Sequence, residues 1–197
     1  MPIFKNKNEG FFKKWTPEMA YVLGFFTADG SMIKNKRGAH FIEFEIIDKD
    51  LLFKIRDLLG SDHKITERKR IRQNKVAYRL QIGSKKMFND LLKIGLTPNK
   101  SKTLYLPNIA NKYFSDFVRG YFDGDGNVIS GYFKKPDRKS KSYSISTRFI
   151  SGSRIFLEGL KLKLTEELAT KGSLSNYGGA WRLHYSIRDS KKLFAFM

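Results

Sequence analysis

Apolar and polar residues alternate along several short segments of the chain, and this pattern predicts β-strands with one buried and one polar face. Tyr78, Leu80 and Ile82 fall on one face of such a strand, whereas Arg79 and Gln81 fall on the other. The hairpins predicted in this way cover 31–47, 63–83 with a turn at 73–75, 127–151, and the region around Gly178. In each half of the chain the polar face carries Arg, Lys, Gln, Ser or His.

Capping residues between these hairpins predict helices. Thr16 followed by Pro17 indicates the start of a helix that ends at Asp29-Gly30. Asp48 and Ser84 are suitable N-caps for two further helices. In the second half, the same signals predict helices at 153–169 and from about Asp189. The expected class is therefore α+β.

The chain contains an internal repeat. Tyr21–Gly30 (YVLGFFTADG) is similar to Phe117–Gly126 (FVRGYFDGDG), and a second similarity in the same order relates 78–82 to 181–185. Two signals in one order predict a duplicated αββαββ(α) unit. The expected organisation is a basic N-terminal arm at 1–15, a first repeat at 16–95, a linker at 96–112 and a second repeat at 113–197. The extra length of the second copy is assigned to 134–142.

Both copies of this motif contain small residues at helical spacing. Ala20, Gly24 and Ala28 are spaced by four, as are Gly120 and Gly124. Glycine inside a helix costs about 1 kcal/mol relative to alanine, so the stripe indicates a close approach by another backbone. The simplest partner is the other motif helix, and this packing would bring the C-terminal ends of both helices together.

Each of these helix ends carries an aspartate. Asp29 and Asp125 face the negative end of the helix dipole, and their convergence would add like-charge repulsion. A divalent cation removes both problems, and carboxylates beside backbone carbonyls suit Mg²⁺. A single Asp-Gly pair is more often a helix stop, but duplication of the whole unit favours a metal site for phosphodiester hydrolysis.

The charge balance indicates a polyanionic partner. The chain of 197 residues has 38 Lys+Arg and 19 Asp+Glu, for a net charge of +19. Nucleic acid is the default partner for such a chain, and an anionic membrane surface is the alternative. The absence of Cys excludes disulfides and thiolate chemistry, and the three His residues lack metal-ligand spacing. No membrane span or secretory signal is present in the pattern, which predicts an intracellular protein without distinguishing cytoplasm, nucleoid or organelle.

Residues on the polar strand faces and adjoining turns are the predicted DNA contacts, because they have the donors and acceptors that bind phosphates and base edges. They are Lys34, Lys36, Lys64, Arg68, Arg70, Arg79, Gln81, Ser144, Ser146, Arg148, Arg182 and His184. A solvated sheet face is the other interpretation of the same residues.

Val22–Gly30 (VLGFFTADG) and Val118–Gly126 (VRGYFDGDG) resemble the nine-residue motif of the LAGLIDADG homing endonucleases, and the resemblance extends over nearly the whole chain. Two motifs in one chain resemble the monomeric members. The resemblance implies two tandem repeats with pseudo-two-fold symmetry, saddle-shaped antiparallel sheets and motif helices packed at the centre. It also implies cleavage of a long, specific duplex site across the minor groove.

The same resemblance assigns roles to residues. Asp29 and Asp125 occupy the position of the metal-binding acids, and the carbonyls of Ala28 and Gly124 would join them. The expected ion is Mg²⁺ or Mn²⁺, with Ca²⁺ supporting binding only. Lys100 matches a basic residue of the active centre, although a solvated linker lysine is the competing interpretation. The second repeat ends inside its last helix, so it is interpreted as truncated and without a counterpart of Lys100.

The leading hypothesis is thus a metal-dependent, site-specific double-stranded DNA endonuclease acting in intron homing. The alternative is a non-cleaving DNA- or RNA-binding protein of the same fold, an intron maturase or a regulator, with intron RNA as a further partner. Both half-sites lie in one chain, so a monomer is expected.

Overall fold

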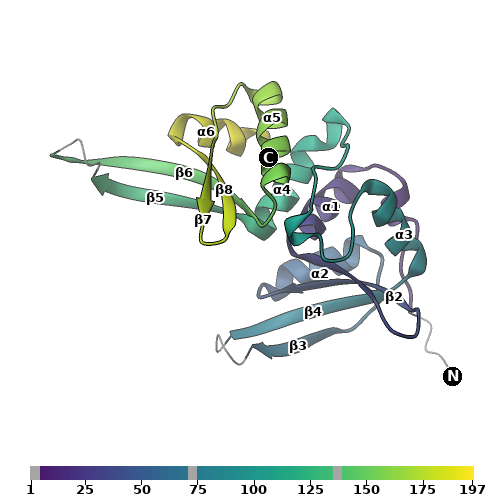
Figure 1. Cartoon of the computed structure of the whole chain (residues 1–197). Coiled ribbons are helices and arrows are strands. Elements are labelled where there is room, and N and C mark those ends of the chain that lie inside the picture. Colours follow the sequence, from purple (N-terminus) through teal and green to yellow (C-terminus); the bar gives the residue numbers. More distant parts are fainter. Residues whose placement is uncertain (1–4, 71–74, 135–138) are drawn as a thin grey trace. The chain divides into compact units, whose positions relative to one another are not determined.

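The chain folds into two four-stranded antiparallel sheets, each packed against helices on one face (Figure 1). The computed structural model describes residues 5–70, 75–134 and 139–197. This arrangement confirms the α+β class predicted from the sequence. Most of the predicted turn at 73–75 and part of the predicted insertion at 134–142 lie outside the described residues. Within the described ranges, no helix is long and apolar enough to cross a membrane.

Both sheets have the same topology, which confirms the duplication. Sheet 1 has the strand order β1-β2-β4-β3 and sheet 2 has the order β5-β6-β8-β7. The strands are β1 (Gly30–Lys34), β2 (His40–Ile46), β3 (Ile65–Arg70), β4 (Lys75–Gly83), β5 (Gly126–Lys134), β6 (Lys141–Ser151), β7 (Ser173–Tyr177) and β8 (Ala180–Tyr185). Their registers also correspond, since Phe44 opposes Gly30 and Leu80 just as Phe149 opposes Gly126 and Leu183.

Six α-helices have their bounds close to those predicted. They are α1 (Pro17–Asp29), α2 (Lys49–Leu58), α3 (Lys85–Ile94), α4 (Phe114–Asp125), α5 (Arg154–Leu168) and α6 (Ile187–Phe196), with short 3-10 turns η1 (Phe11–Lys13), η3 (Lys100–Lys102) and η4 (Asn111–Tyr113). The predicted N-caps are confirmed. Side-chain oxygens of Thr16, Asp48 and Ser84 accept the backbone N–H three residues later, at 3.1, 2.9 and 3.2 Å. Such caps each contribute about 1 kcal/mol.

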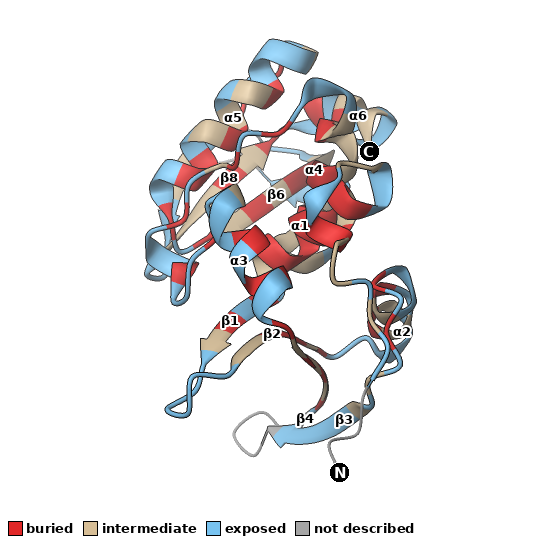
Figure 2. Cartoon of the chain, turned by 90° about the vertical axis from the view of Figure 1, so that its right-hand side faces the viewer, coloured by how far each residue is buried: buried red, intermediate tan, exposed pale blue. Residues whose placement is uncertain are grey.

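Aromatic side chains fill the space between each sheet and its helices, and α1 is buried along most of its length (Figure 2). In sheet 1, Phe44 has ring centroids of Phe25 and Phe26 at 6.3 and 5.2 Å. In sheet 2, Phe149 has Phe122 at 5.7 Å. Full burial of such a side chain stabilises a fold by roughly 1.5–3 kcal/mol, so these layers hold the sheets against the helices and leave the opposite faces polar.

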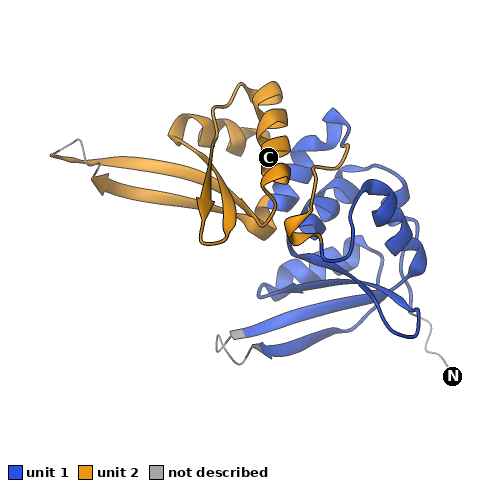
Figure 3. Ribbon diagram, viewed as in Figure 1, with its two compact units in different colours: residues 1–99, 109–121 blue, residues 100–108, 122–197 orange. Residues whose placement is uncertain are grey.

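The chain divides into two compact units (Figure 3). Unit 1 contains Met1–Asn99 and Ile109–Tyr121, and unit 2 contains Lys100–Asn108 and Phe122–Met197. The first eight residues of α4 therefore pack with unit 1, whereas the segment that carries Lys100 packs with unit 2. These units describe packing and the predicted repeats describe sequence similarity, so the repeat boundaries at 16–95 and 113–197 stay a prediction.

Candidate nucleic-acid interface and acidic residues

The small residues of the motif helices pack helix against helix, as predicted. In unit 1, a Cβ atom added to Gly24 of α1 would collide with the backbone carbonyl of Phe117 on α4. The contact is reciprocal, because a Cβ on Gly120 would collide with the carbonyl of Tyr21. Backbone atoms occupy the space that a side chain would need. The two glycines thus allow an approach that no other residue allows.

Each motif helix ends at its aspartate. Asp29 is the last residue of α1 and is exposed, and Asp125 is the last residue of α4 and is partly exposed. Strands β1 and β5 begin at the next residue, so both carboxylates stand at a helix-to-strand junction. Two residues before Asp29, the hydroxyl of the buried Thr27 donates a hydrogen bond to the carbonyl oxygen of Leu23 at 2.7 Å. The approach of Asp29 to Asp125 remains a prediction.

The donor chemistry around these junctions fits a hard divalent cation. The carboxylates of Asp29 and Asp125 and the carbonyls of Ala28 and Gly124 are all oxygen donors, and the chain contains no cysteine. No group of three or more His, Cys, Asp or Glu side chains that could hold a metal occurs in the described part of the chain. Each junction thus provides one carboxylate and one backbone carbonyl as oxygen donors.

Lys100 lies in a segment that is fixed to unit 2. The residue is buried, with 7% of its surface exposed, and it begins η3. A Cβ on Gly152, at the end of β6, would collide with the carbonyl of Ser101, and the hydroxyl of Ser153 donates to the carbonyl of Leu104 at 2.7 Å. Lys100 is therefore held by neighbouring backbone contacts and is not a solvated linker residue.

The polar face of sheet 1 holds Arg68, Arg79 and Gln81, three of the predicted contacts. Two acidic residues of β2 share this face. Glu43 accepts from Arg79 Nε at 2.6 Å and from Gln81 Nε2 at 2.8 Å, and Glu45 accepts from Arg68 Nη1 at 3.1 Å. Arg68 and Arg79 are thus compensated within the sheet.

The remaining predicted residues of this half are more dispersed. Lys36 lies exposed in the turn between β1 and β2, and Lys64 is exposed immediately before β3. Lys34 pairs with His40 and has the same parity as buried Met32, so it lies on the opposite face of sheet 1 from Arg79. Arg70 ends β3, and its side chain is outside the described part.

Sheet 2 brings its five predicted contacts together on one face. Ser144, Ser146 and Arg148 alternate along β6, and His184 stands directly opposite Arg148. Arg182 lies two residues before His184 on the same face, where its guanidinium stacks on the Tyr177 ring at 4.9 Å. Among described residues, the buried Nε atoms of Arg148 and Arg182 and the Ser146 hydroxyl have no hydrogen-bond partner. This face therefore contains several buried polar atoms without a hydrogen-bond partner in the described part of the chain.

These cations change the titration of the histidine between them. Partial burial lowers the pKa of His184 below its usual value of 6.5, and the charges of Arg148 and Arg182 lower it further. The Nδ1 atom of His184 lies 2.9 Å from the hydroxyl of Ser173. At neutral pH the ring is therefore neutral and hydrogen-bonded within the sheet.

The LAGLIDADG-like domain family matches residues 16–94, which span the first motif and all of sheet 1. Residues 16–94 are thus similar to this domain family. The match confirms the resemblance at the first motif, and the second motif lies outside the matched residues. The uncharacterized protein MJ0398 of Methanocaldococcus jannaschii is 26% identical over 211 residues, covering 97% of this chain and 72% of that protein. The RNA polymerase subunit Rpo1C of the same organism is 29% identical over 153 residues, which are 75% of this chain but 15% of that protein.

Solved structures extend the likeness in fold to nearly the whole chain. The homing endonuclease I-WcaI bound to its DNA recognition sequence has a TM-score of 0.68 and 19% identity, covering 96% of this chain and 85% of that one. The meganuclease I-SmaMI bound to uncleaveable DNA has a TM-score of 0.63 and 15% identity, over 92% and 83%. I-SmaMI has also been solved with uncleaved DNA in the presence of calcium ions. The fold is the two-repeat LAGLIDADG fold.

Glu43 and Glu45 are the site residues that the sequence analysis missed. The alternation Ile42-Glu43-Phe44-Glu45-Ile46 places both acids opposite the core, so it contained the signal. Acids on a cationic face are overlooked when only residues with donors for phosphates and base edges are considered as DNA contacts. The pairing of Glu43 with β4 and of Glu45 with β3 then emerges only from the strand register.

Proposed function

We propose that this chain is a site-specific double-stranded DNA endonuclease that acts in intron homing as a monomer. The observation that carries the proposal is the duplicated helix that ends in aspartate and leads directly into a sheet with a polar, donor-rich face. One copy alone would be a helix stop. Two copies supply one carboxylate for each strand of a duplex.

Different residues of the chain would bind the DNA and cleave it. The polar faces of sheets 1 and 2 would bind phosphates and base edges, and the close contacts of Gly24 with Phe117 and of Gly120 with Tyr21 would hold the two motif helices at a fixed separation. Lys100, held by its segment's contacts with Gly152 and Ser153, would stabilise the charge that develops on the attacked phosphate. Its burial gives that charge a stronger effect than it would have in water.

Asp29 and Asp125, with the carbonyls of Ala28 and Gly124, are the groups that would hold a divalent cation. We assign Mg²⁺ or Mn²⁺, because these ions prefer carboxylate, carbonyl and water oxygens and leave positions open for phosphate. When bound, such an ion polarises the phosphoryl oxygen and lowers the pKa of a coordinated water. The two acids also lie where the helix dipoles disfavour unbalanced negative charge, which favours cation binding there.

The test is selection of cleaved duplexes from a randomised DNA library by the full chain in Mg²⁺, with Ca²⁺ in a parallel reaction. We expect wild type to yield one long preferred site in Mg²⁺ and binding without cutting in Ca²⁺. Asp29→Asn and Asp125→Asn should each lower cleavage by about a hundredfold or more, because metal contacts supply several kcal/mol to such reactions. DNA binding should persist in both variants.

Asp57→Asn is the matched control, since Asp57 is an exposed carboxylate on α2 that pairs only locally with Arg56 at 2.9 Å. It should cleave like wild type. Retention of full cleavage by both Asp29→Asn and Asp125→Asn would refute the assignment. Tight, selective binding by a wild type that never cuts would favour the non-cleaving binding protein instead.

A further inference from the structure

Glu43 is a buried acid in the middle of the polar face of sheet 1. Only 7% of its surface is exposed, and it stands on β2 directly opposite Gln81 of β4. A carboxylate in this position faces the surface that the proposed function assigns to a polyanion, which it would repel. The structure therefore requires a reason for its presence that a general basic surface does not provide.

The contacts of Glu43 supply that reason. One oxygen, Oε2, accepts from both Arg79 Nε at 2.6 Å and Gln81 Nε2 at 2.8 Å. The guanidinium of Arg79 also forms an ion pair with this carboxylate. Because both donors converge on the same buried atom, the side chains of Arg79 and Gln81 are held in place relative to β2.

The carboxylate also determines which way round the Gln81 amide lies. An ionised carboxylate only accepts hydrogen bonds, so Gln81 must turn its NH₂ group toward Glu43. One N–H is then used within the sheet, and the second N–H and the carbonyl oxygen remain available. A donor and an acceptor side by side complement N7 and N6–H of adenine, the pairing that glutamine makes in the major groove.

We propose that Glu43 is a specificity-determining positioning residue: it fixes the Gln81 amide for adenine and withholds Arg79 from the phosphates. This inference rests on the proposed DNA-binding function. Under this proposal, sheet 1 recognises DNA bases through oriented hydrogen bonds and not through positive charge. The equivalent register position in sheet 2 is Arg148, which lies opposite His184 as Glu43 lies opposite Gln81.

The experiment compares wild type with Glu43→Gln in the full chain, using duplexes selected from a randomised library in Ca²⁺. Glutamine at 43 keeps the size of the side chain but can donate as well as accept, so the Gln81 amide is no longer oriented. We expect the adenine preference at one base pair to fall by about tenfold. Arg79, released from its carboxylate, should steepen the log–log salt dependence of binding by about 0.9, the value of one further phosphate contact.

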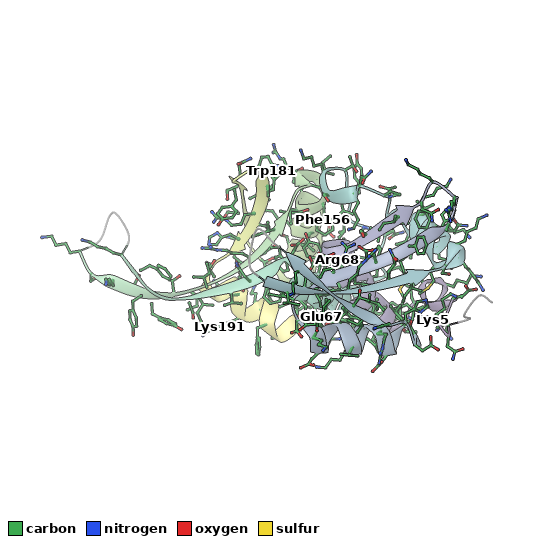
Figure 4. All side chains as sticks on the ribbon, turned by 90° about the horizontal axis from the view of Figure 1, so that it is seen from below. Lys5, Glu67, Arg68, Phe156, Trp181 and Lys191 are labelled. Carbon is green, nitrogen blue, oxygen red and sulfur yellow. The ribbon has the colours of Figure 1, made fainter. Side chains whose placement is uncertain are left out.

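Two further variants make the result specific. Glu67→Gln removes one negative charge from β3, where alternation places Glu67 on the opposite face from Arg68 (Figure 4). It should leave the base preference unchanged. Gln81→Leu should abolish the adenine preference at the same base pair as Glu43→Gln while leaving the salt slope near the wild-type value. It also tests the assignment if Glu43→Gln fails to fold.

The outcomes separate this inference from the proposed function. The role of Glu43 alone is overturned if the wild type selects a site and Glu43→Gln retains the same adenine preference. If Glu43→Gln does not fold, the same preference retained in Gln81→Leu overturns that role. A wild type that selects no duplex and binds without salt dependence overturns the proposed function, and this inference with it.

Discussion

The two sheets share a topology and a register but differ in the electrostatics of their polar faces. In sheet 1, Glu43 neutralises Arg79 and engages Gln81. In sheet 2, the equivalent position is Arg148, which faces His184, and the Nε atoms of Arg148 and Arg182 have no partner among described residues. Two register positions, Glu43 in place of Arg148 and Glu45 in place of Ile150, thus separate a compensated face from a cationic one. Duplication preserved the fold because the core residues determine it, whereas the polar faces were free to diverge.

Under the proposed function, this difference predicts that the two sheets contribute differently to DNA affinity and to base discrimination. A compensated network recognises hydrogen-bond patterns and contributes little to salt-dependent affinity, whereas guanidinium groups without a carboxylate partner bind phosphates or guanine strongly. Sheet 2 should therefore supply most of the electrostatic affinity, and sheet 1 more of the discrimination. The following changes test that comparison.

The largest effect is expected at the helix contact in unit 1 on which the motif helices depend. Gly24→Ala places a methyl group against the backbone carbonyl of Phe117 and beside the N–H of Tyr121, neither of which can move without its helix. Overpacking of this kind costs about 3 kcal/mol, which exceeds the gain of roughly 1 kcal/mol from alanine's helix propensity. Thermal or urea unfolding of the purified chain measures the loss.

Gly159→Ala in unit 2 is the matched control. Gly159 is also a helical glycine, but the nearest atom to an added Cβ is Leu106 Cβ at 3.1 Å, a contact that a shift of a few tenths of an ångström relieves. We expect a change near zero, or a small stabilisation. If both alanine variants unfold alike, the close backbone contact between α1 and α4 is not what makes glycine necessary at position 24.

The next largest effect is expected from converting sheet 2 to the pattern of sheet 1. Arg148→Glu removes one unpaired cation and places a carboxylate where it can pair with Arg182, as Glu43 pairs with Arg79. Two phosphate contacts would be lost, so the log–log salt slope should decrease by about 1.8. We expect duplex affinity at about 0.1 M salt to fall roughly a hundredfold, measured by a binding titration at several salt concentrations.

Arg188→Glu controls for net charge, because Arg188 is exposed on α6, which packs against the other face of sheet 2. Its effect should be several-fold smaller. An equal loss of affinity in both variants would mean that overall charge governs binding. The electrostatic difference between the two sheets would then have no effect on DNA binding.

Much of the fold could be predicted from the sequence, because its signals are local. Thr16, Asp48 and Ser84 mark helix starts through a hydrogen bond to a residue three positions away, and alternation sets each strand's faces. The glycine stripe also predicted its own packing, because glycine inside a helix is costly without a close neighbour.

The residues that were predicted less well depend on distant contacts. Lys100 lies in a polar, proline-flanked linker pattern, and its burial results from packing of its segment against Gly152 and Ser153, some fifty residues away. Lys34 is basic and exposed, yet the parity of β1 places it on the opposite face from Arg79. The pairing of Glu43 with Arg79 requires the register between β2 and β4, which no local pattern specifies.

The smallest expected effect concerns His184, whose titration distinguishes the cationic face from the compensated one. Its folded-state pKa lies below 6.5 because of burial and the two arginines, while the unfolded chain keeps the ordinary value. Above pH 6.5 the ring is neutral in both states and contributes nothing. As the pH falls through 6.5, the unfolded state takes up the proton first, so the free energy of unfolding decreases relative to His184→Gln until the folded ring also protonates.

DNA should reverse this sign, because phosphates beside Arg148 and Arg182 favour the imidazolium. Wild-type duplex affinity should therefore increase between pH 7 and pH 5.5 relative to His184→Gln, while stability without DNA decreases over the same interval. Paired binding and unfolding titrations across this range measure both trends, and His63 titrates equally in both proteins and cancels. If affinity follows the same pH dependence in wild type and His184→Gln, then His184 does not face the duplex, and the polar face of sheet 2 is solvated instead of bound.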